Sequence, residues 1–148
     1  MAAFDRFVAL ARRGAGTVPL ATGLFLVARL AASKGHAEVA RSQLREALEE
    51  AIRDDSWAQI ATGLDTAVDT FWYLGEARAA AVLAGVVETT LAPLRWPYVA
   101  SRGPGLPVRT ANLTAARETL GDATYEQVRA EGAAMSRQDA VAFALQHL

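Results

Sequence analysis

The sequence predicts a single all-α domain built from packed, antiparallel helix pairs. Apolar residues recur with the period of about 3.6 that is typical of helices, and no segment alternates strictly between apolar and polar residues as a strand does. Glycine, proline and capping residues interrupt this pattern and divide the chain into short helices. A chain of 148 residues has the length of one domain, because a core of this size folds without disulfides or metals.

Five helices are expected in the first part of the chain, residues 1–94. Gly14 and Gly16 end the first, and Thr17 caps the second, with Pro19 in its first turn where a missing N–H is tolerated. Gly35 and Gly75 end the second and fourth helices. Ser56 and Gln59 have capping-box spacing, which predicts reciprocal bonds between their side chains and backbone N–H groups. The five helices are expected over residues 3–13, 17–34, 37–53, 57–74 and 76–94.

These helices differ in how much of their surface is apolar. The helix over 37–53 is amphipathic and is expected to lie at the surface; its apolar stripe is Val39, Ala40, Leu44, Ala47, Leu48, Ala51 and Ile52. The core stripe expected for the helix over 57–74 is Trp57, Ile60, Leu64, Ala67, Val68 and Phe71. The helix over 17–34 is apolar nearly all round, which predicts burial on two sides. Its run from Val18 to Ala28 is shorter than the roughly 20 residues needed to cross a bilayer.

A proline- and glycine-rich segment separates these helices from the C-terminal part. Residues 95–109 contain Pro97, Gly103, Pro104, Gly105 and Pro107, so we expect a long loop there. Three shorter helices are expected beyond it, over 110–120, 124–131 and 137–147, separated by Gly121, Gly132 and a Ser136–Asp139 capping pair. Residues 110–148 are therefore predicted to form a helical cap.

Composition argues against several classes of function. The formal net charge is -1, which does not favour direct binding to nucleic acid. The absence of cysteine excludes a disulfide framework, a thiolate zinc site and a cysteine nucleophile. The first residues carry Asp5 and no apolar core of a secretory signal. We expect a cytoplasmic protein that does not insert into membranes.

No set of residues in the sequence forms a catalytic constellation. Asp65 and Asp69 share one helix face, as metal-binding carboxylates would, but no E-x-x-H partner accompanies them, so a solvated face is the favoured interpretation. His36 is expected in an exposed turn and His147 at a helix end. None of the serines has nucleophile-elbow surroundings, and neither glycine cluster has the context of a phosphate loop. We therefore predict no enzyme activity, metal or cofactor.

Aromatic residues are the candidates for a binding surface. Phe71, Trp72 and Tyr73 are consecutive on a helix, so at about 100° per residue they cannot all face one core. Trp96 and Tyr98 add two large rings in the long segment. Packing between repeats is the favoured interpretation and ligand binding the alternative. The candidate binding residues are Trp72, Tyr73, Trp96 and Tyr98.

An internal repeat connects the helix pairs. Gly35–Ala40 and Gly75–Ala80 share the pattern G-x-A-x-x-A at a spacing of 40 residues, and each copy joins a first helix to a second. This arrangement resembles tetratricopeptide repeats, stretched from their usual length of about 34 residues and without their usual proline. The resemblance implies a right-handed superhelical stack of antiparallel pairs.

The order of weaker motifs from Gly35 to Leu148 resembles the C-terminal helical-repeat region of actinobacterial STAND-type ATPases of the LuxR-type regulator class, some of which are fused to adenylate cyclases. The residues that carry the resemblance are Leu74–Glu88, then, after the proline-containing segment, Ala115–Gly121, Arg129–Gly132 and the helix led by Ser136. The chain has no nucleotide-binding loop, cyclase segment or DNA-binding helix-turn-helix, so only the module's role carries over.

This resemblance implies a regulatory module that binds a protein, peptide or small inducer and modulates an ATP-dependent transcriptional regulator or signalling protein. The alternative is a structural homo-oligomerisation domain without a ligand. Because the helix over 17–34 is apolar nearly all round, we expect its uncovered side to meet either preceding repeats of a longer chain or a second copy.

Overall fold

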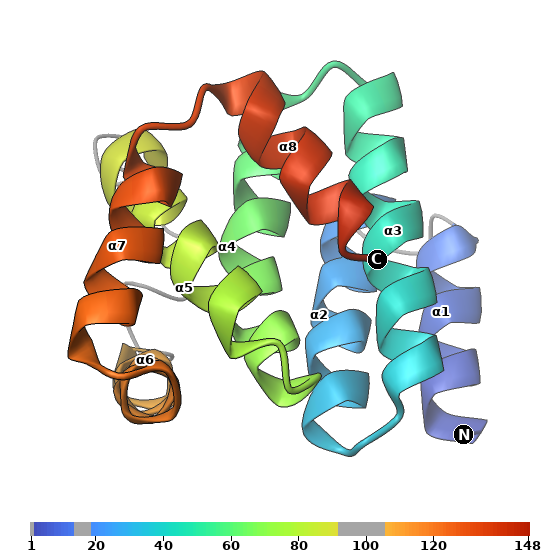
Figure 1. The fold of residues 1–148 in the computed structure, drawn as a ribbon. Helices are drawn as coiled ribbons and strands as arrows, with labels where there is room; N and C mark the ends of the chain where they lie inside the picture. Colours follow the sequence, from blue (N-terminus) through green and yellow to red (C-terminus); the bar gives the residue numbers. More distant parts are fainter. Residues whose placement is uncertain (1, 14–18, 92–105) are drawn as a thin grey trace.

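The computed structural model describes residues 2–13, 19–91 and 106–148, and these residues form helices and the turns between them, with no strand. Figure 1 shows the helices as two upright pairs with the C-terminal elements packed beside and across them. Their bounds are α1 Ala2–Arg12, α2 Leu20–Ser33, α3 Ala37–Arg53, α4 Trp57–Tyr73, α5 Ala77–Val86, the π-helix η1 Val87–Leu91, α6 Leu106–Leu120, α7 Asp122–Ala133 and α8 Arg137–Gln146. The all-α prediction is confirmed. None of the helices described is long and apolar enough to cross a membrane.

The pairs α2–α3 and α4–α5 turn in the same way. Gly35 and Gly75 have φ of 78° and 80°, the left-handed region that glycine adopts without strain. In each turn the glycine N–H donates to a carbonyl three residues back, and the next N–H donates to a carbonyl five residues back, at 2.9 to 3.0 Å. A Cβ atom at either glycine would have open space around it, so backbone conformation is the reason for glycine here.

The turn between α3 and α4 has this geometry without glycine. Asp55 has φ of 48°, and Ser56 N–H donates to Ala51 O at 3.1 Å. Ser56 Oγ accepts from Gln59 N–H at 3.4 Å, which confirms half of the predicted capping box. The reciprocal half is wrong, because the Ser56 N–H is already bound by Ala51, and Gln59 Oε1 has no partner among the described residues.

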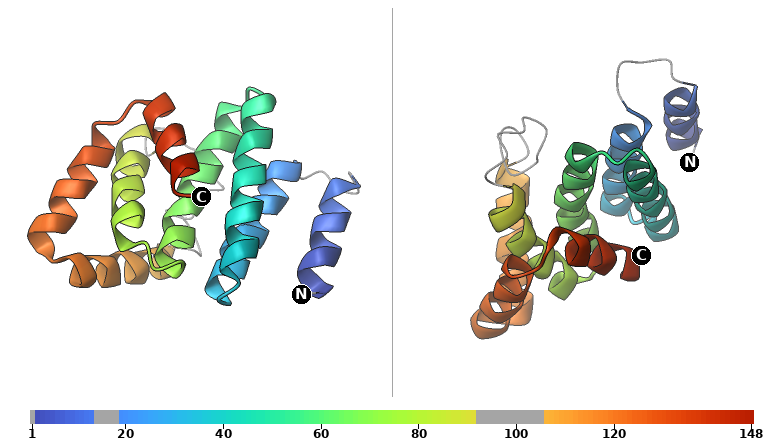
Figure 2. Two further views of the ribbon diagram at one scale, coloured as in Figure 1. Left: turned by 45° about the vertical axis from the view of Figure 1, so that its right-hand side comes forward. Right: turned by 90° about the horizontal axis from the view of Figure 1, so that it is seen from above.

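Helix α4 is the central element of the fold. It packs against α2, α3, α5, α6 and α8, and Figure 2, seen from above, shows it between the α2–α3 pair and the C-terminal helices. Every residue from Ala61 to Phe71 is buried. The predicted stripe of Leu64, Ala67, Val68 and Phe71 is fully buried, while Trp57 and Ile60 are partly buried against it. An element enclosed on all sides must bury its polar residues as well.

Two glycines allow α5 and α7 to approach closely. A Cβ atom on Gly85 would lie 1.9 Å from Arg129 O, and one on Gly132 would lie 1.8 Å from Val82 O. Both positions lie inside helices, so the expectation that Gly132 ends a helix is wrong. At this crossing the backbone of α7 occupies the space that a side chain at Gly85 would need, and the backbone of α5 occupies the space that a side chain at Gly132 would need.

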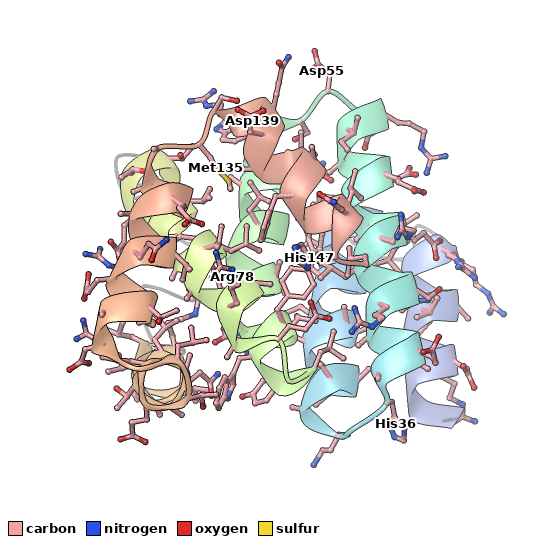
Figure 3. The ribbon with its side chains drawn as sticks, in the orientation of Figure 1. His36, Asp55, Arg78, Met135, Asp139 and His147 are labelled. Atoms are coloured by element: carbon pink, nitrogen blue, oxygen red, sulfur yellow. The ribbon has the colours of Figure 1, made fainter. Side chains whose placement is uncertain are left out.

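Helix α8 crosses the face of α4 and ends beside α3 (Figure 1). It buries Ala140 and Ala144, and its last carbonyls accept hydrogen bonds from α3: Arg41 donates to His147 O at 2.7 Å and Arg45 to Leu145 O at 3.3 Å. His147 lies at this junction, where Figure 3 labels it, with Nδ1 3.3 Å from a Glu76 carboxylate oxygen. The predicted helix-end position of His147 is confirmed, as is the exposed turn position of His36.

Several predicted boundaries differ from the structure. Pro19 precedes α2 as its N-cap instead of lying within the first turn. The α-helical part of the fifth helix ends at Val86 and continues as the π-helix η1, where Thr89 Oγ1 donates to both Gly85 O and Ala133 O at 3.2 Å. Ile52, in the last turn of α3, is exposed and not part of the core stripe. Thr17 and residues 92–105 lie outside the described residues.

The largest correction concerns the segment expected as a loop up to Arg109. Helix α6 begins at Leu106, four residues before its predicted start, with Pro107 in its first turn. Proline is tolerated there because the first N–H groups of a helix have no intrahelical acceptor. Arg109 is therefore a helical residue, and it is buried.

Candidate functional site

A charged cluster lies buried where α6 meets α4. Arg109 of α6 is 4% exposed, and Asp65 and Asp69 of α4 are each about as enclosed. Asp65 and Asp69 are one turn apart on the side of α4 that faces α6, so one guanidinium reaches both carboxylates. The interpretation of these aspartates as a solvated face is wrong, because α6 covers that face of α4.

The Arg109 guanidinium is matched closely to its partners. Its Nε and Nη2 donate to the two oxygens of Asp69, each at 3.0 Å, which is the bidentate arrangement of a strong arginine–carboxylate pair. Nη1 donates to Asp65 Oδ1 at 3.1 Å, and Nη2 also donates to Asp65 O at 2.6 Å. Asn112, one turn along α6, donates its amide to Asp69 Oδ1 at 2.9 Å. The cluster therefore fixes α6 to α4 in one register.

The aspartates keep the Arg109 guanidinium charged in spite of its burial. Burial alone lowers the pKa of Arg109, but the charges and hydrogen bonds of Asp65 and Asp69 outweigh burial and leave the pKa raised. Arg29 of α2 lies at the edge of the cluster, 38% exposed, with Nη1 3.9 Å from Asp69 Oδ2, a distance at which the two charges attract each other without a hydrogen bond.

A cavity of about 390 Å³ opens beside Arg29, between α2, the end of α4 and the start of α6. We call it the α2–α4–α6 groove; its lining residues are Leu26, Arg29, Leu30, Ser33, Tyr73 and Val108. Leu26 is 53% exposed, Leu30 50% and Val108 49%, and they are three of the six large apolar side chains that are exposed among the described residues. Apolar side chains gathered around a hollow are typical of a binding surface.

The predicted binding residues are separated by the structure. Tyr73 lines the α2–α4–α6 groove. Trp72 does not: it packs, partly buried, against both of the larger core clusters. Trp96 and Tyr98 lie outside the described residues. The prediction that three consecutive aromatic residues reach more than one surface is confirmed, because Phe71 is fully buried while Tyr73 faces the groove.

Sequence reasoning missed the charged member of the groove and the cluster behind it. Arg109 and Asn112 have the i, i+3 spacing of one helix face, but the prolines and glycines before Arg109 predict a loop there. Nothing in the sequence marks Arg29 as a binding residue, because a single arginine after an apolar run is common in helices without a binding site. Extending α6 back through Pro107 would have placed Arg109 and Asn112 on one face and suggested a buried acidic partner.

A second cavity, of about 310 Å³, lies between α5, α6 and α7 and is less suited to a ligand. Most of its polar lining already forms ion pairs or hydrogen bonds within the protein, although Arg117 Nε is buried and donates no hydrogen bond among the described residues. Arg117 pairs with Glu126 and, at 3.3 Å, with Asp122, and its guanidinium carbon lies 4.9 Å from the centre of the Tyr125 ring. Burial, and next the charge of Glu88, raise the pKa of Tyr125.

The described residues offer no arrangement for catalysis by a metal. No group of three or more histidine, aspartate or glutamate side chains among them is placed to hold a metal ion.

No protein-family model matches the chain, and neither a curated protein nor a solved structure matches it significantly. The function is therefore inferred from the groove and the cluster behind it.

Proposed function

We propose that this chain is a non-catalytic interaction module of tetratricopeptide-like build that binds a protein, peptide or small inducer in the α2–α4–α6 groove. The observation that carries the proposal is the gathering of half-exposed Leu26, Leu30 and Val108 around one cavity. Exposing these side chains to water is unfavourable, and a ligand seated on them would remove that cost.

The arrangement of the pairs supports this assignment. Helices α2 and α4 are the first helices of the two pairs that turn at Gly35 and Gly75, and both contribute to the groove. In stacked helix-pair repeats the extended surface formed by equivalent helices is the usual binding surface. A right-handed superhelical stack, continued by further repeats, is the arrangement that we propose for the longer assembly.

The buried cluster supports a regulatory role. Arg29 links α2 to Asp69 of α4, and Asp69 is bound in turn by Arg109 of α6. A ligand that moves Arg29 would act on the contact that positions the C-terminal helices. We propose that the module uses this connection to bias a cytoplasmic ATP-dependent transcriptional regulator or signalling protein. The basis for that effector is the order of sequence motifs shared with STAND-type regulators.

A ligand screen with matched variants tests the proposal. Thermal unfolding is measured against a library of small molecules and short peptides, because a ligand at 100 times its Kd stabilises the folded state by about 2.7 kcal/mol. We expect hits that stabilise the wild type and Leu10→Gln but not Leu30→Gln. Leu10, 55% exposed on α1, is the matched control for Leu30. A screen without any stabilising ligand would contradict the proposal.

The same exposed side chains also favour a second candidate, a homo-oligomerisation domain. Leu26 and Leu30 are one turn apart on α2 and would meet their equivalents in a symmetric dimer. Light scattering distinguishes the two functions: a dimer that Leu30→Gln dissociates and Leu10→Gln does not, combined with no ligand stabilisation, supports assembly. Trp72 is unsuitable for this test because its substitution would disturb the core.

A further inference from the structure

We infer that the α2–α4–α6 groove takes a small amphiphilic carboxylate, an apolar chain ending in one carboxyl group that pairs with Arg29. This inference rests on the proposed function and names the chemical class of its ligand. Three properties of the groove carry it: the apolar walls, the single charge among the described residues that line it, and the few hydrogen-bonding groups that these residues offer to a peptide backbone.

The walls of the groove fit an apolar chain. Leu26 and Leu30 come from α2, Val108 from α6 and Tyr73 from the end of α4, so three helices present apolar surface to one space. A volume of about 390 Å³ lies within the range of small-molecule sites, at its lower end. The groove therefore suits a short chain better than a large ring system.

Among the described residues of the lining, Arg29 is the one that carries a charge, and its side chain is 38% exposed. At 3.9 Å from Asp69 it is too far away to donate a hydrogen bond, and it donates none to the other described residues. Asp69 does not need it as a donor, because both Asp69 oxygens accept from Arg109 at 3.0 Å. Arg29 thus keeps its paired N–H groups for a second carboxylate, which they match in geometry.

The negative charges behind Arg29 do not face the groove. Asp65 and Asp69 are each within about 2% of full burial and are held by Arg109, whereas the Arg29 side chain is 38% exposed. A ligand in the groove therefore meets the cation before it meets either carboxylate.

The polar groups in the lining suit a lone carboxylate better than a peptide. Leu26, Arg29 and Leu30 lie inside α2, where backbone groups are bonded within the helix, and Ser33 Oγ donates to Leu30 O at 2.9 Å. A peptide laid in the groove would find few partners for its own N–H and C=O groups among the described lining residues, which is unfavourable. A free acid has one polar group, and Arg29 can satisfy it.

Calorimetric titration of the full chain with four probes tests the inference: octanoate, hexanoate, 1-octanol and octylammonium. We expect octanoate to bind more tightly than 1-octanol, and octylammonium to bind most weakly. If the chain is buried, octanoate should bind about 15-fold more tightly than hexanoate, from the transfer free energy of two CH₂ groups. Arg29→Met should weaken octanoate binding about tenfold or more and leave 1-octanol binding unchanged.

Matched variants keep the result interpretable if Arg29→Met disturbs the fold. Leu30→Gln, at a half-exposed position, should weaken octanoate and 1-octanol alike, and Leu10→Gln should weaken neither. Equal binding of octanoate and 1-octanol in the wild type overturns the carboxylate assignment and leaves the proposed function standing. So does failure of all four probes when the broader screen yields another ligand.

A peptide arm distinguishes the source of the carboxylate. The probe is an acetylated tripeptide, Ala-Ala-Leu, with a free C-terminal carboxylate. We expect it to bind more weakly than octanoate, because its amide groups find few partners among the described residues of the groove. Tighter binding of the tripeptide would overturn the assignment to a free acid. A screen in which neither these probes nor any library member binds would contradict the proposed function as well.

Discussion

The contact of α6 with α4 and the contact of α7 with α5 join the C-terminal helices to the same core by different means. The α4–α6 contact relies on charge: Arg109 and Asn112 bind the buried carboxylates of α4. The α5–α7 contact relies on the absence of side chains: Gly85 and Gly132 let two backbones meet. The α4–α6 contact depends on matched charges and hydrogen bonds, whereas the α5–α7 contact depends on close steric fit.

This difference predicts different responses to substitution. A buried ion pair contributes little net stability when both partners are present, but removal of one partner leaves an uncompensated charge. At a close backbone contact there is no charged partner to remove. An added side chain lowers the free energy of unfolding by the part of the steric clash that neighbouring atoms cannot relieve by moving. The α4–α6 contact should therefore be rescued by second substitutions, and the α5–α7 contact should not.

Breaking the charged contact should have the largest effect. Arg109→Met leaves Asp65 and Asp69 buried without their cation, and we expect the free energy of unfolding to fall by about 3 to 5 kcal/mol. Urea denaturation, monitored by circular dichroism, measures this loss. Arg109→Lys should be less damaging because it keeps the charge, but it cannot bind both oxygens of Asp69 and reach Asp65 together.

Rescue identifies the cause of this loss. Adding Asp65→Asn and Asp69→Asn to Arg109→Met removes the buried charges, and we expect the triple variant to regain at least half of the lost stability. If the triple variant is no more stable than Arg109→Met, then packing of the Arg109 side chain, and not charge, holds α6 in place.

Adding one methyl group at the close crossing should have the next largest effect. The Cβ of Gly132→Ala would lie 1.8 Å from Val82 O, a backbone atom that cannot move without shifting α5, and we expect a loss of about 3 kcal/mol. Gly35→Ala is the matched control, since it has free space but a φ of 78°, and it should cost about 1 to 2 kcal/mol. If the two variants lose the same free energy of unfolding, then α5 and α7 can shift apart to accommodate the methyl group.

The two contacts also show how far the sequence predicts this fold. The turns at Gly35 and Gly75 and the cap at Ser136 follow from local chemistry, and the structure has each of them at its predicted residue. Local patterns also identify the apolar stripe of α4. Such features depend on residues within one or two helical turns, which is the distance over which a sequence pattern carries information.

The contacts between distant helices were not predicted, for physical reasons that the residues make plain. Asp65 and Asp69 look like a solvated face because their cation lies 44 and 40 residues away, on a helix whose start contains proline. Gly132 looks like a helix end because glycine weakens helices, and only the position of Val82 shows why α7 needs it. The groove depends on three such helices, so of its lining only Tyr73 was foreseen.

The smallest expected effect is a pH dependence confined to the α5–α7 side. Burial and Glu88 raise the pKa of Tyr125, so the folded state holds this proton more tightly than the unfolded state, whose tyrosine titrates near 10. The stabilisation is therefore complete below pH 10 and is lost as the pH rises towards the folded-state pKa. Comparing the free energies of unfolding of wild type and Tyr125→Phe between pH 8 and 11 isolates this contribution. We expect the wild type to lose more stability over this range than the variant, and equal slopes would show that Tyr125 is not held in its neutral form by its surroundings.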